Sequence, residues 1–455
     1  MCGINALFSK NNDIFDHLCE SLYHLHHRGQ DTFGFSYFDD NNNIHLLKKK
    51  GLIGNHNIKP IQTFCGIGHV RYPTSGKNTI NECQPFYLEG NYHNISFVHN
   101  GHINYDKLSS YLNDNNIDYN KNITSDSHLL LYYLSHLLNQ HKTITNDIIQ
   151  TIVETIHSNE YIVGSYNCIC LIDTYGLICF KDKYSIRPLI LGKKNDNYII
   201  SSESISITSI NYEIINDIYN NDIITFDNQR NFHKLQLSLS NDIKPCIFEW
   251  IYLAREESIL YGVNVYESRL KMGEFLAKKI INSMNINNID HIIPIPDTSK
   301  PVALEIAKIL KKPYYEAITK NRYVNRTFIM NTQNTRKKNI KRKLNVIKHL
   351  IYQKNVLIVD DSIVRGNTIK HIIKLLKDNN VNKIFIAVSS PKIINKNIYG
   401  LDIPNKEELL SYNKSDTEIE KELQIEKIFF QNLNDLISSI NHFQKLNDFE
   451  TSIFH

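Results

Sequence analysis

The stretch NVLIVDDSIVRGNTIKHII occupies residues 355–373 and carries the strongest structural signal in the chain. It opens with a run of aliphatic residues that ends in two adjacent carboxylates, Asp360 and Asp361. A short loop follows and leads into a helical pattern. The polar and small residues of this loop and of the helix start are Ser362, Arg365, Gly366, Asn367 and Thr368. A buried strand, a loop and a helix in this order are typical of an open parallel α/β sheet, in which ligands bind where the strands end.

The residue types of this loop indicate what it binds. Backbone amides at a helix N-terminus bind anions, and a glycine lets a phosphate approach closely. Carboxylates beside a bound phosphate would repel it unless they hold something else, so we expect Asp360 and Asp361 to contact ribose hydroxyls and a magnesium ion. The alternative is an ordinary strand-to-helix turn whose acidic side chains are solvated.

From about residue 260 onward, strand-like and helix-like segments alternate. The helical patterns MGEFLAKKIINSM, VALEIAKILKK and TIKHIIKLLKD alternate with the apolar runs HIIPIP, NVLIVDD and KIFIAVS. This alternation predicts a doubly wound parallel sheet. We expect the final stretch, residues 407–441, to form helices that pack on this second domain.

The first half of the chain has a different pattern. Short β-like runs, among them ISFVHNG, YNCICLID, LICFKD and NYIISSES, are separated by tight turns, and the helical stretch SDSHLLLYYLSHLLNQ lies between them. This predicts an α+β domain with much antiparallel pairing. We place the boundary near NDIKPCIFEW, which gives a first domain of residues 2–240 and a second of residues 241–455.

Length and composition limit the function classes. A chain of 455 residues is too long for one ordinary core, and 42% hydrophobic with 22% charged residues is typical of a globular protein. A net charge of +4 is too small to indicate a nucleic-acid or membrane partner, and we see no bilayer-spanning run and no secretory leader. The eight cysteines include no CxxC pair. We therefore expect a cytoplasmic protein without a disulfide framework or a zinc site.

The N-terminus, MCGINALF, places a cysteine directly behind the initiator methionine. If the methionine is removed, Cys2 carries a thiol and a free α-amine whose ordinary pKa is about 7.7–8.0. Such a residue holds a nucleophile and its base together. The alternative is that Cys2 is an accident of the start site.

The segment 355–373 resembles the signature of type I phosphoribosyltransferases. The resemblance implies that Asp360 and Asp361 contact the ribose and its metal, and that the residues from Arg365 to Thr368 hold the 5-phosphate. Ser362 is expected to belong to the same substrate site. The turn PIPDTSKP resembles the pyrophosphate loop of these enzymes, with Ser299 near the magnesium. Between the two loops lies a basic segment, residues 320–345, which we expect to form a lid over pyrophosphate, with Lys320 and Arg322 binding the substrate. The alternatives are a solvated basic run and a nuclear-localisation or nucleic-acid patch.

Four motifs that follow MCGI, namely LHHRGQD, GIGHVRYPTSG, FVHNGHI and TSDSHLL, resemble the N-terminal-nucleophile glutamine amidotransferases. The resemblance implies that Cys2 attacks the side-chain amide of glutamine, and that the side chain of Asn100 and the amide of Gly101 form the oxyanion hole. It also implies a role for three charged side chains around the glutamine. These are Arg71 on the α-carboxylate, Asp126 on the α-ammonium, and Arg28 on a mobile loop over the site. His26 and His27 are expected to be structural.

A glutaminase followed by a phosphoribosyltransferase resembles the amidophosphoribosyltransferase family, in the type without an iron–sulfur cluster. This implies hydrolysis of glutamine and transfer of ammonia to 5-phosphoribosyl-1-pyrophosphate, which gives 5-phosphoribosylamine, glutamate and pyrophosphate in the first committed step of de novo purine (IMP) biosynthesis. The expected cofactor is one Mg²⁺ per subunit. No iron–sulfur cluster is expected, because only Cys246 could match one of four cysteine ligands and Thr451 lies where another would be. Purine nucleotide feedback inhibitors and a homotetramer are expected partners, and nucleic acid and membrane are not.

Two other classes of protein share part of this sequence pattern. Asparagine synthetase and glucosamine-phosphate synthase share the glutaminase, but they lack the VDDSIVRG loop. A non-catalytic, nucleotide-sensing relative would keep the fold as a binding module, and the intact set of Cys2, Arg71, Asn100 and Asp126 argues against it. The departures from the family pattern include Asn367 in RGNT, Asn325 in NRYVNR where the family has glycine, and YLAREES in place of an aromatic-ARPDS motif.

Overall fold

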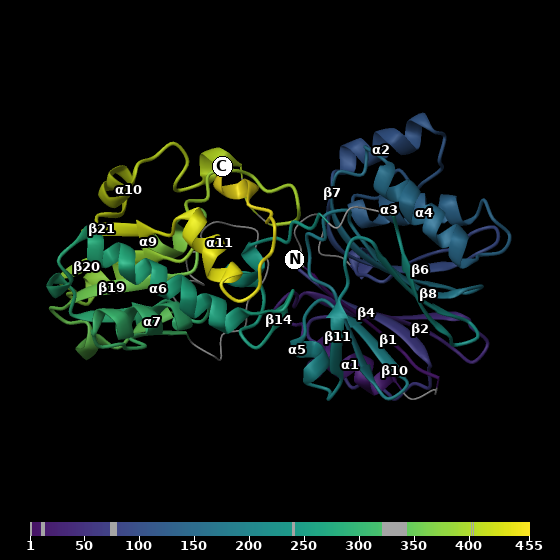
Figure 1. Ribbon diagram of the computed structural model, residues 1–455, viewed down its shortest axis with the longest axis horizontal. Coiled ribbons are helices and arrows are strands. Elements are labelled where there is room, and N and C mark those ends of the chain that lie inside the picture. Colours follow the sequence, from purple (N-terminus) through teal and green to yellow (C-terminus); the bar gives the residue numbers. More distant parts are fainter. Residues whose placement is uncertain are drawn as a thin grey trace.

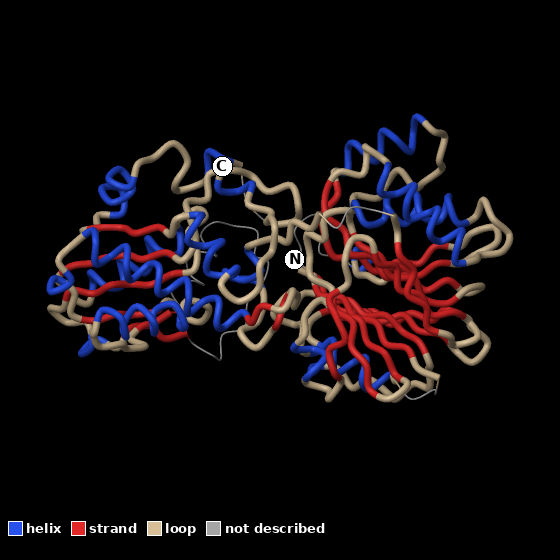
Figure 2. The backbone as a smooth tube through the Cα atoms, in the orientation of Figure 1, coloured by secondary structure: helices blue, strands red, loops and turns tan. Residues whose placement is uncertain are grey.

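A computed structural model describes residues 2–10, 14–72, 80–238, 242–320, 344–401, 403 and 405–455 of the chain. Two parts lie side by side (Figures 1 and 2). The first is a pair of stacked antiparallel sheets with helices outside them, and the second is a parallel sheet between two layers of helices.

The first sheet of the N-terminal half has seven strands, and all of its neighbouring pairs are antiparallel. In spatial order they are β11 (Glu213–Asp217), β9 (Ile190–Lys194), β10 (Asn197–Ser201), β1 (Gly3–Phe8), β4 (Cys65–Arg71), β2 (Thr32–Phe38) and β3 (Ile44–Lys50). The first strand of the chain is thus central, hydrogen-bonded on both sides, and every residue of it is buried. This holds the start of the chain in place, although chain ends ordinarily fray.

The second sheet has six antiparallel strands. In spatial order they are β13 (Phe232–Gln236), β12 (Asp222–Asp227), β8 (Gly176–Lys181), β7 (Gly164–Ile172), β6 (Ile95–Ile103) and β5 (Phe86–Leu88). The two sheets face each other across an apolar layer in which Ile4 and Ala6 of β1 pack with Val98 and Ile169. The alternation of side chains along each strand supplies this inner layer and leaves the other face of each sheet for helices.

Helices cover both outer faces of the sandwich (Figure 1). Helices α1 (Phe15–Tyr23) and α5 (Ile205–Thr208) lie on the seven-stranded sheet. Helices α2 (Tyr105–Asp114), α3 (Asp126–Leu138) and α4 (Asn146–Ser158) lie on the six-stranded sheet. The predicted α+β half with antiparallel pairing is therefore confirmed.

The second half is built on a parallel sheet of four strands in the described residues. In order they are β16 (His291–Pro294), β19 (Asn355–Asp360), β20 (Lys383–Val388) and β21 (Lys427–Phe430). Helices α6 (Val265–Ser283), α7 (Lys300–Leu310) and α11 (Leu433–Asn441) cover one face, and α9 (Asn367–Asp378) and α10 (Asp416–Leu423) cover the other. Both faces of the strands are buried, which explains their continuous apolar runs and confirms the doubly wound prediction.

The prediction that residues 407–441 are all helical is wrong in part. The run KIFF forms strand β21, which pairs in parallel with β20. Phe429 packs with the helices on one face of the sheet and Phe430 with those on the other. A four-residue apolar run between two helical patterns becomes a strand here because the sheet edge beside β20 pairs with its backbone groups.

The remaining elements are short. Two antiparallel strand pairs are β14 (Ile259–Leu260) with β15 (Val263–Asn264) and β17 (Ile318–Lys320) with β18 (Leu344–Val346). The turns are the π-helical η3 (Glu249–Leu253) and the 3₁₀ turns η1 (Ile53–Asn55), η2 (Ile80–Glu82), η4 (Ile286–Asn288), η5 (Lys348–Leu350), η6 (Lys406–Glu408) and η7 (Ser452–Phe454).

One apolar cluster runs through both halves. It contains Leu7 and Phe35 of the first half together with Leu357 and Phe449 of the second. Trp250, the single tryptophan of the chain, is fully buried in this cluster, with its ring centre 5.9 Å from that of Phe449. The two halves therefore share a core, and the domain boundary near residue 240 stays a prediction.

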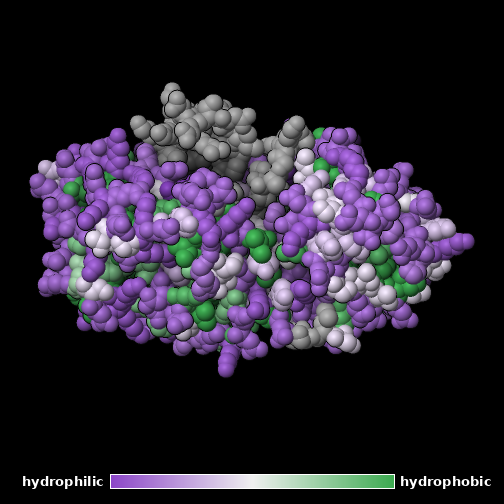
Figure 3. Space-filling view, turned by 90° about the horizontal axis from the view of Figure 1, so that it is seen from above, coloured by the Kyte–Doolittle hydropathy of each residue, from purple (hydrophilic) through white to green (hydrophobic). Residues whose placement is uncertain are grey.

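One face of the molecule is mostly polar (Figure 3). On the face shown in Figure 3, hydrophobic residues form small separate spots within a hydrophilic surface. Within the described ranges, none of the helices combines the length and the apolar character that crossing a membrane requires.

The shared core allows a test of how the two halves are held together. Phe449→Ala removes a buried ring, 4% exposed, that packs on Trp250, so it should lower the free energy of unfolding by about 3–5 kcal/mol. Trp250 fluorescence during chemical denaturation measures this directly. Phe443→Ala, at a position that is 42% exposed, is the control and should change stability by no more than about 0.5 kcal/mol. Equal effects of the two substitutions would contradict the shared core.

Candidate active sites

One candidate site lies at the carboxyl end of the parallel sheet. Strand β19 ends at Asp360, and Asp360 and Asp361 are each only 8% exposed. Asp361 accepts hydrogen bonds from the hydroxyls of Thr298 and Ser362, the latter at 2.7 Å, while the Asp360 carboxylate accepts from the amide of Asp361 at 3.0 Å. The sheet thus brings together the ends of β16 and β19, as expected for neighbouring parallel strands.

Ionisation of the two carboxyl groups is energetically unfavourable at this buried position. Burial, and then the neighbouring Asp361, raise the pKa of Asp360 well above its usual range. Burial also raises the pKa of Asp361, although hydrogen bonds from Ser362 and Thr298 and the charge of Arg269 lower it. A bound cation offsets such a cost, so this donor set fits Mg²⁺. Mg²⁺ commonly binds one or two carboxylates and takes its other ligands from substrate phosphates and water.

The phosphate loop leads into a helix, as its sequence predicts. Gly366 caps helix α9 with a φ of +77°, a left-handed conformation that favours glycine. Asn367 and Thr368 follow as the exposed first residues of the helix. The Arg365 side chain is exposed and pairs with Glu408 at 3.0 Å. The helix start therefore presents backbone amides to solvent, as an anion site requires.

The second loop differs from the prediction at one residue. The hydroxyl of Ser299 is fully buried and donates to the carbonyl of Ile295 at 2.6 Å, so it does not face the carboxylates. Its neighbour Thr298 contacts Asp361 instead, while Ser299 is the residue directly before helix α7 (Lys300–Leu310). Lys320 reaches the same loop and pairs with Asp297 at 3.1 Å. Arg322 and the rest of the expected lid, residues 321–343, lie outside the described residues.

The other candidate site lies at the start of the chain. Gly3 pairs with Val70, so Cys2 and Arg71 lie at the same end of β1 and β4. The thiol of Cys2 is partly exposed and lies 4.0 Å from the carbonyl oxygen of Tyr72, and Arg71 is 7% exposed. The sheet pairing therefore puts a thiol beside a guanidinium.

Asn100 and Gly101 lie on β6, in the facing sheet. The side chain of Asn100 is buried, and among the described residues its Nδ2 has no hydrogen-bond partner, so it is available as a donor. A Cβ atom at Gly101 would lie 2.0 Å from the carbonyl oxygen of Ser165 on β7, so only glycine fits. Both residues have the properties that an oxyanion hole requires.

Asp126 is the first residue of helix α3 and lies beside the end of β6. Its carboxylate accepts from the amide of Ile103 at 2.8 Å and from that of Ser127 at 2.9 Å. The hydroxyl of Ser127 bonds His99 Nδ1 at 2.7 Å, and burial lowers the pKa of His99. The fold thus holds a fixed carboxylate two residues beyond the Asn100–Gly101 pair along β6.

The second half reaches this site directly. The carbonyl oxygen of Tyr399 accepts from the hydroxyl of Ser165 at 2.8 Å and from Arg187 Nη2 at 2.5 Å. A Cβ atom at Gly400, whose φ is +96°, would lie 3.3 Å from the backbone carbon of Gly101. Residues from the far end of the chain therefore cover the Asn100–Gly101 pair.

Comparison with known proteins agrees with this arrangement. A model of the phosphoribosyl transferase domain family matches residues 264–402. The chain is 38% identical to the amidophosphoribosyltransferase of Pasteurella multocida, with all of this chain and 92% of the relative covered. It is 36% identical to that of Escherichia coli and 34% to that of Saccharomyces cerevisiae, also over the whole chain, with 92% and 91% of the relatives covered. The chain belongs to the amidophosphoribosyltransferase family.

A solved structure supports the same assignment. The glutamine phosphoribosylpyrophosphate amidotransferase of B. subtilis, complexed with ADP and GMP, superimposes with a TM-score of 0.84 at 26% identity over 98% of this chain and 94% of that one. The fold and the enzyme class predicted from the sequence, an amidophosphoribosyltransferase that acts in purine biosynthesis, are thereby confirmed.

The amidophosphoribosyltransferase fold places Arg28 differently from the prediction. Arg28 was expected on a mobile loop over the glutamine site, but it is 3% exposed and pairs with the carboxylates of Glu203 and Glu249. His27 also contacts Glu203, at 2.6 Å, and His26 accepts from the amide of Ile53. Paired and buried side chains of this kind hold a fixed turn, and the expected structural role of the two histidines fits these contacts.

Sequence reasoning missed several residues that the fold places near the two sites. They are Glu203, Glu249, Thr298, Tyr399 and Gly400. An acidic residue inside an apolar run, as in CIFEWIYL, is a usable signal, because a charge is rarely buried without a partner. No comparable signal marks Tyr399 and Gly400, since they contact the first half only through long-range packing.

The tight fit at Gly101 can be tested. Gly101→Ala forces β6 and β7 apart where the oxyanion donors lie, so glutamine-dependent turnover should fall by about 100-fold or more, while turnover with free ammonia persists. Steady-state assays with each nitrogen source measure the two rates. Gly54→Ala is the control, because a Cβ there meets only the half-exposed ring of Tyr23, at 3.3 Å. An unchanged glutamine rate in Gly101→Ala would contradict the proposed position of the oxyanion hole.

Proposed function

We propose that this chain hydrolyses glutamine at Cys2 and transfers the ammonia to C1 of 5-phosphoribosyl-1-pyrophosphate. The products are glutamate, pyrophosphate and 5-phosphoribosylamine, and the reaction is the first committed step of de novo purine biosynthesis. The observation that carries the proposal is the contact of two residues of the second half, Tyr399 and Gly400, with the first half. Gly400 lies against Gly101 on β6, and Tyr399 accepts a hydrogen bond from the neighbouring strand β7.

In the first step, the thiolate of Cys2 attacks the side-chain amide carbon of glutamine. After removal of Met1, the α-amine of Cys2 accepts the thiol proton and passes it to the departing ammonia. Asn100 Nδ2 and the Gly101 amide stabilise the oxyanion as it forms. Water then hydrolyses the γ-glutamyl thioester and releases glutamate. Burial lowers the pKa of His99, which weakens this imidazole as a base, and its Nδ1 is hydrogen-bonded to the hydroxyl of Ser127.

The amino-acid part of glutamine is held by two opposite charges. Arg71 binds the α-carboxylate and Asp126 the α-ammonium. Hydrogen bonds from two backbone amides hold the carboxylate of Asp126 in place for this role. Arg28 acts behind Arg71 and does not contact glutamine, which fits its burial between Glu203 and Glu249.

In the second step, ammonia attacks C1 of the ribose, the C1–O bond breaks, and pyrophosphate leaves. The loop from Ser362 to Thr368 holds the 5-phosphate, and Lys320 and Arg322 bind pyrophosphate. Asp360 and Asp361 would hold the ribose hydroxyls and one Mg²⁺ per subunit, and such an ion would supply positive charge against the leaving pyrophosphate.

Several further properties belong to this proposal. The glutaminase spans residues 2–240 and the phosphoribosyltransferase residues 241–455. The protein works in the cytoplasm as a homotetramer without an iron–sulfur cluster, as the resemblance implies. Purine nucleotides inhibit it, which is supported by the ADP and GMP in the B. subtilis structure.

The nucleophile is tested by Cys2→Ala. Without the thiol no thioester forms, so glutamine-dependent synthesis should fall by at least about 1,000-fold, while ammonia-dependent synthesis remains within about twofold. Intact-mass measurement of the wild-type protein should show loss of Met1. Cys19→Ala, at the other partly exposed thiol, is the control and should keep both activities. Retained glutaminase activity in Cys2→Ala would disprove the assignment.

The phosphoribosyl site is tested by Asp360→Asn. Removing one charge from the buried pair weakens the hold on ribose and metal, so kcat/KM for phosphoribosyl pyrophosphate should fall by about 100-fold or more. Basal glutamine hydrolysis should stay near the wild-type rate. Asp378→Asn, at the exposed far end of helix α9, is the matched control. If the two variants had the same kcat/KM, Asp360 would have no role in this site.

A further inference from the structure

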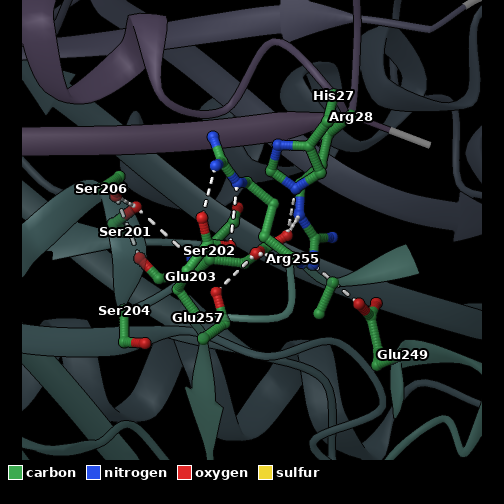
Figure 4. Close-up of polar contacts among 12 residues, drawn as sticks. His27, Arg28, Ser201, Ser202, Glu203, Ser204, Ser206, Glu249, Arg255 and Glu257 are labelled. Carbon is green, nitrogen blue, oxygen red and sulfur yellow. Dashed lines mark hydrogen bonds and ion pairs between the residues drawn. The ribbon is translucent and has the colours of Figure 1, made fainter. Parts of the chain in front are cut away.

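Glu203 is a buried carboxylate to which the motifs assign no role. It follows strand β10 and is 0% exposed. One of its oxygens, Oε1, accepts from His27 Nε2 at 2.6 Å and from Arg28 Nε, and Figure 4 shows both of these side chains pointing toward it. The other, Oε2, accepts from the amide of Arg255 at 3.0 Å and from the hydroxyl of Ser258 at 2.7 Å. One oxygen therefore binds the first half of the chain and the other binds the second half.

The charges around Glu203 are balanced inside the protein. Arg28 also donates to Glu249 at 2.7 Å, and Glu249 lies 3.4 Å from Arg187. All four side chains are almost completely buried. Although burial raises the pKa of Glu203, the charges of Arg28 and His27 lower it well below the usual range. A buried ion that loses its partner is strongly unfavourable, so these side chains hold one another in a single arrangement.

One connection leads from Glu203 to the nucleophile. The amide of Ser202, the preceding residue, donates to the carbonyl of Ile4 at 3.0 Å, and the amide of Ile4 donates to the hydroxyl of Ser202 at 3.0 Å. Ile4 lies two residues after Cys2. The backbone that carries Glu203 is thus bonded to the backbone that carries Cys2.

A second connection leads to Arg71. The turn that holds Arg28 continues into Gly29, where a Cβ atom would lie 2.5 Å from the backbone carbon of Arg71. Two residues later, the amide of Asp31 donates to the carbonyl of Arg71 at 3.3 Å. The position of Arg28 therefore determines where the backbone of Arg71 lies.

On the other side, Glu203 contacts a segment that the second half holds rigidly. The amide of Ile259 donates to the hydroxyl of Ser204 at 2.7 Å, next to the contacts of Arg255 and Ser258. Arg269, on helix α6, donates to the carbonyls of Trp250 and Ala254, each at 2.9 Å. Residues 254–259 are thus tied both to Glu203 and to a helix of the parallel sheet.

We propose that Glu203 is a positioning residue for glutamine hydrolysis. Its carboxylate joins the turn behind Arg71 to residues 255–258 of the second half, and its neighbour Ser202 is bonded to Ile4 beside Cys2. Glu203 thereby sets the geometry in which the thiol meets glutamine. This inference rests on the proposed roles of Cys2 and Arg71.

The first test is Glu203→Gln, which keeps the shape of the side chain and removes its charge. The glutamine side chain would place an N–H donor where one carboxylate oxygen now accepts hydrogen bonds. The groups around it are themselves donors, so the contacts to Arg28 and to residues 255–258 cannot all persist. The kcat/KM for glutamine should fall by about 10- to 100-fold, chiefly through a higher KM, because Arg71 is displaced. Ammonia-dependent synthesis, which does not use Cys2 or Arg71, should stay within about twofold of wild type, whereas a general folding defect would lower both activities.

The second test is Ser258→Ala, which removes one donor from the far half and leaves the ion pairs intact. A selective loss of about 3- to 10-fold in kcat/KM for glutamine is expected. Asp222→Asn is the control. Asp222 is a buried carboxylate of the first half that pairs with Lys234 at 2.9 Å, and its substitution should not change the KM for glutamine.

The outcomes separate the possibilities. If Glu203→Gln loses both activities, the Ser258→Ala variant distinguishes a positioning role from a general folding defect. A selective loss with glutamine supports the inference, whereas an equal loss with both nitrogen sources, or no loss, overturns it. Glutaminase activity retained in Cys2→Ala would instead overturn the proposed function, whatever the Glu203 variants do.

Discussion

The position of the proposed nucleophile, Cys2, depends on the strand that follows it directly. Strand β1 holds it from the centre of a seven-stranded sheet, with β4 on one side and β10 on the other and with every residue buried. Antiparallel pairing with β4 also sets where Arg71 lies relative to the thiol. The rest of the glutamine site is built around this fixed strand.

Strand β10, which pairs with β1, leads to the residues that join the two halves. The residues that follow β10 carry Glu203 into a closed set of buried charges, and half of its contacts come from beyond residue 250. Buried ion pairs are poor sources of stability compared with apolar side chains, but they tolerate few alternative arrangements. The apolar cluster around Trp250 packs the two halves together. The buried ion pairs of Glu249 with Arg28 and Arg187 favour one relative position of the halves. Ammonia released at one site can then meet a second site in a defined place.

Much of this protein could be predicted from its sequence, where the signal is local. The aliphatic run before Asp360 predicts a buried strand, Gly366 marks a left-handed helix cap, and the periodicity of TIKHIIKLLKD predicts α9. The failures share one cause. Strand β21 exists because an edge of a sheet is there to pair with it, and the hydroxyl of Ser299 bonds the carbonyl of Ile295 because the fold buries the turn before α7. Neither cause is present in the local sequence.

The sequence by itself determined the order of the two modules, the residue types at both sites and the secondary structure around them. Each of these follows from chemistry within a few neighbouring residues. Only the tertiary structure decided which distant groups meet: Arg28 with Glu203 and Glu249, and Gly400 with Gly101. A buried charge needs a partner, but the sequence does not name it, because the partner is selected by how sheets and helices pack.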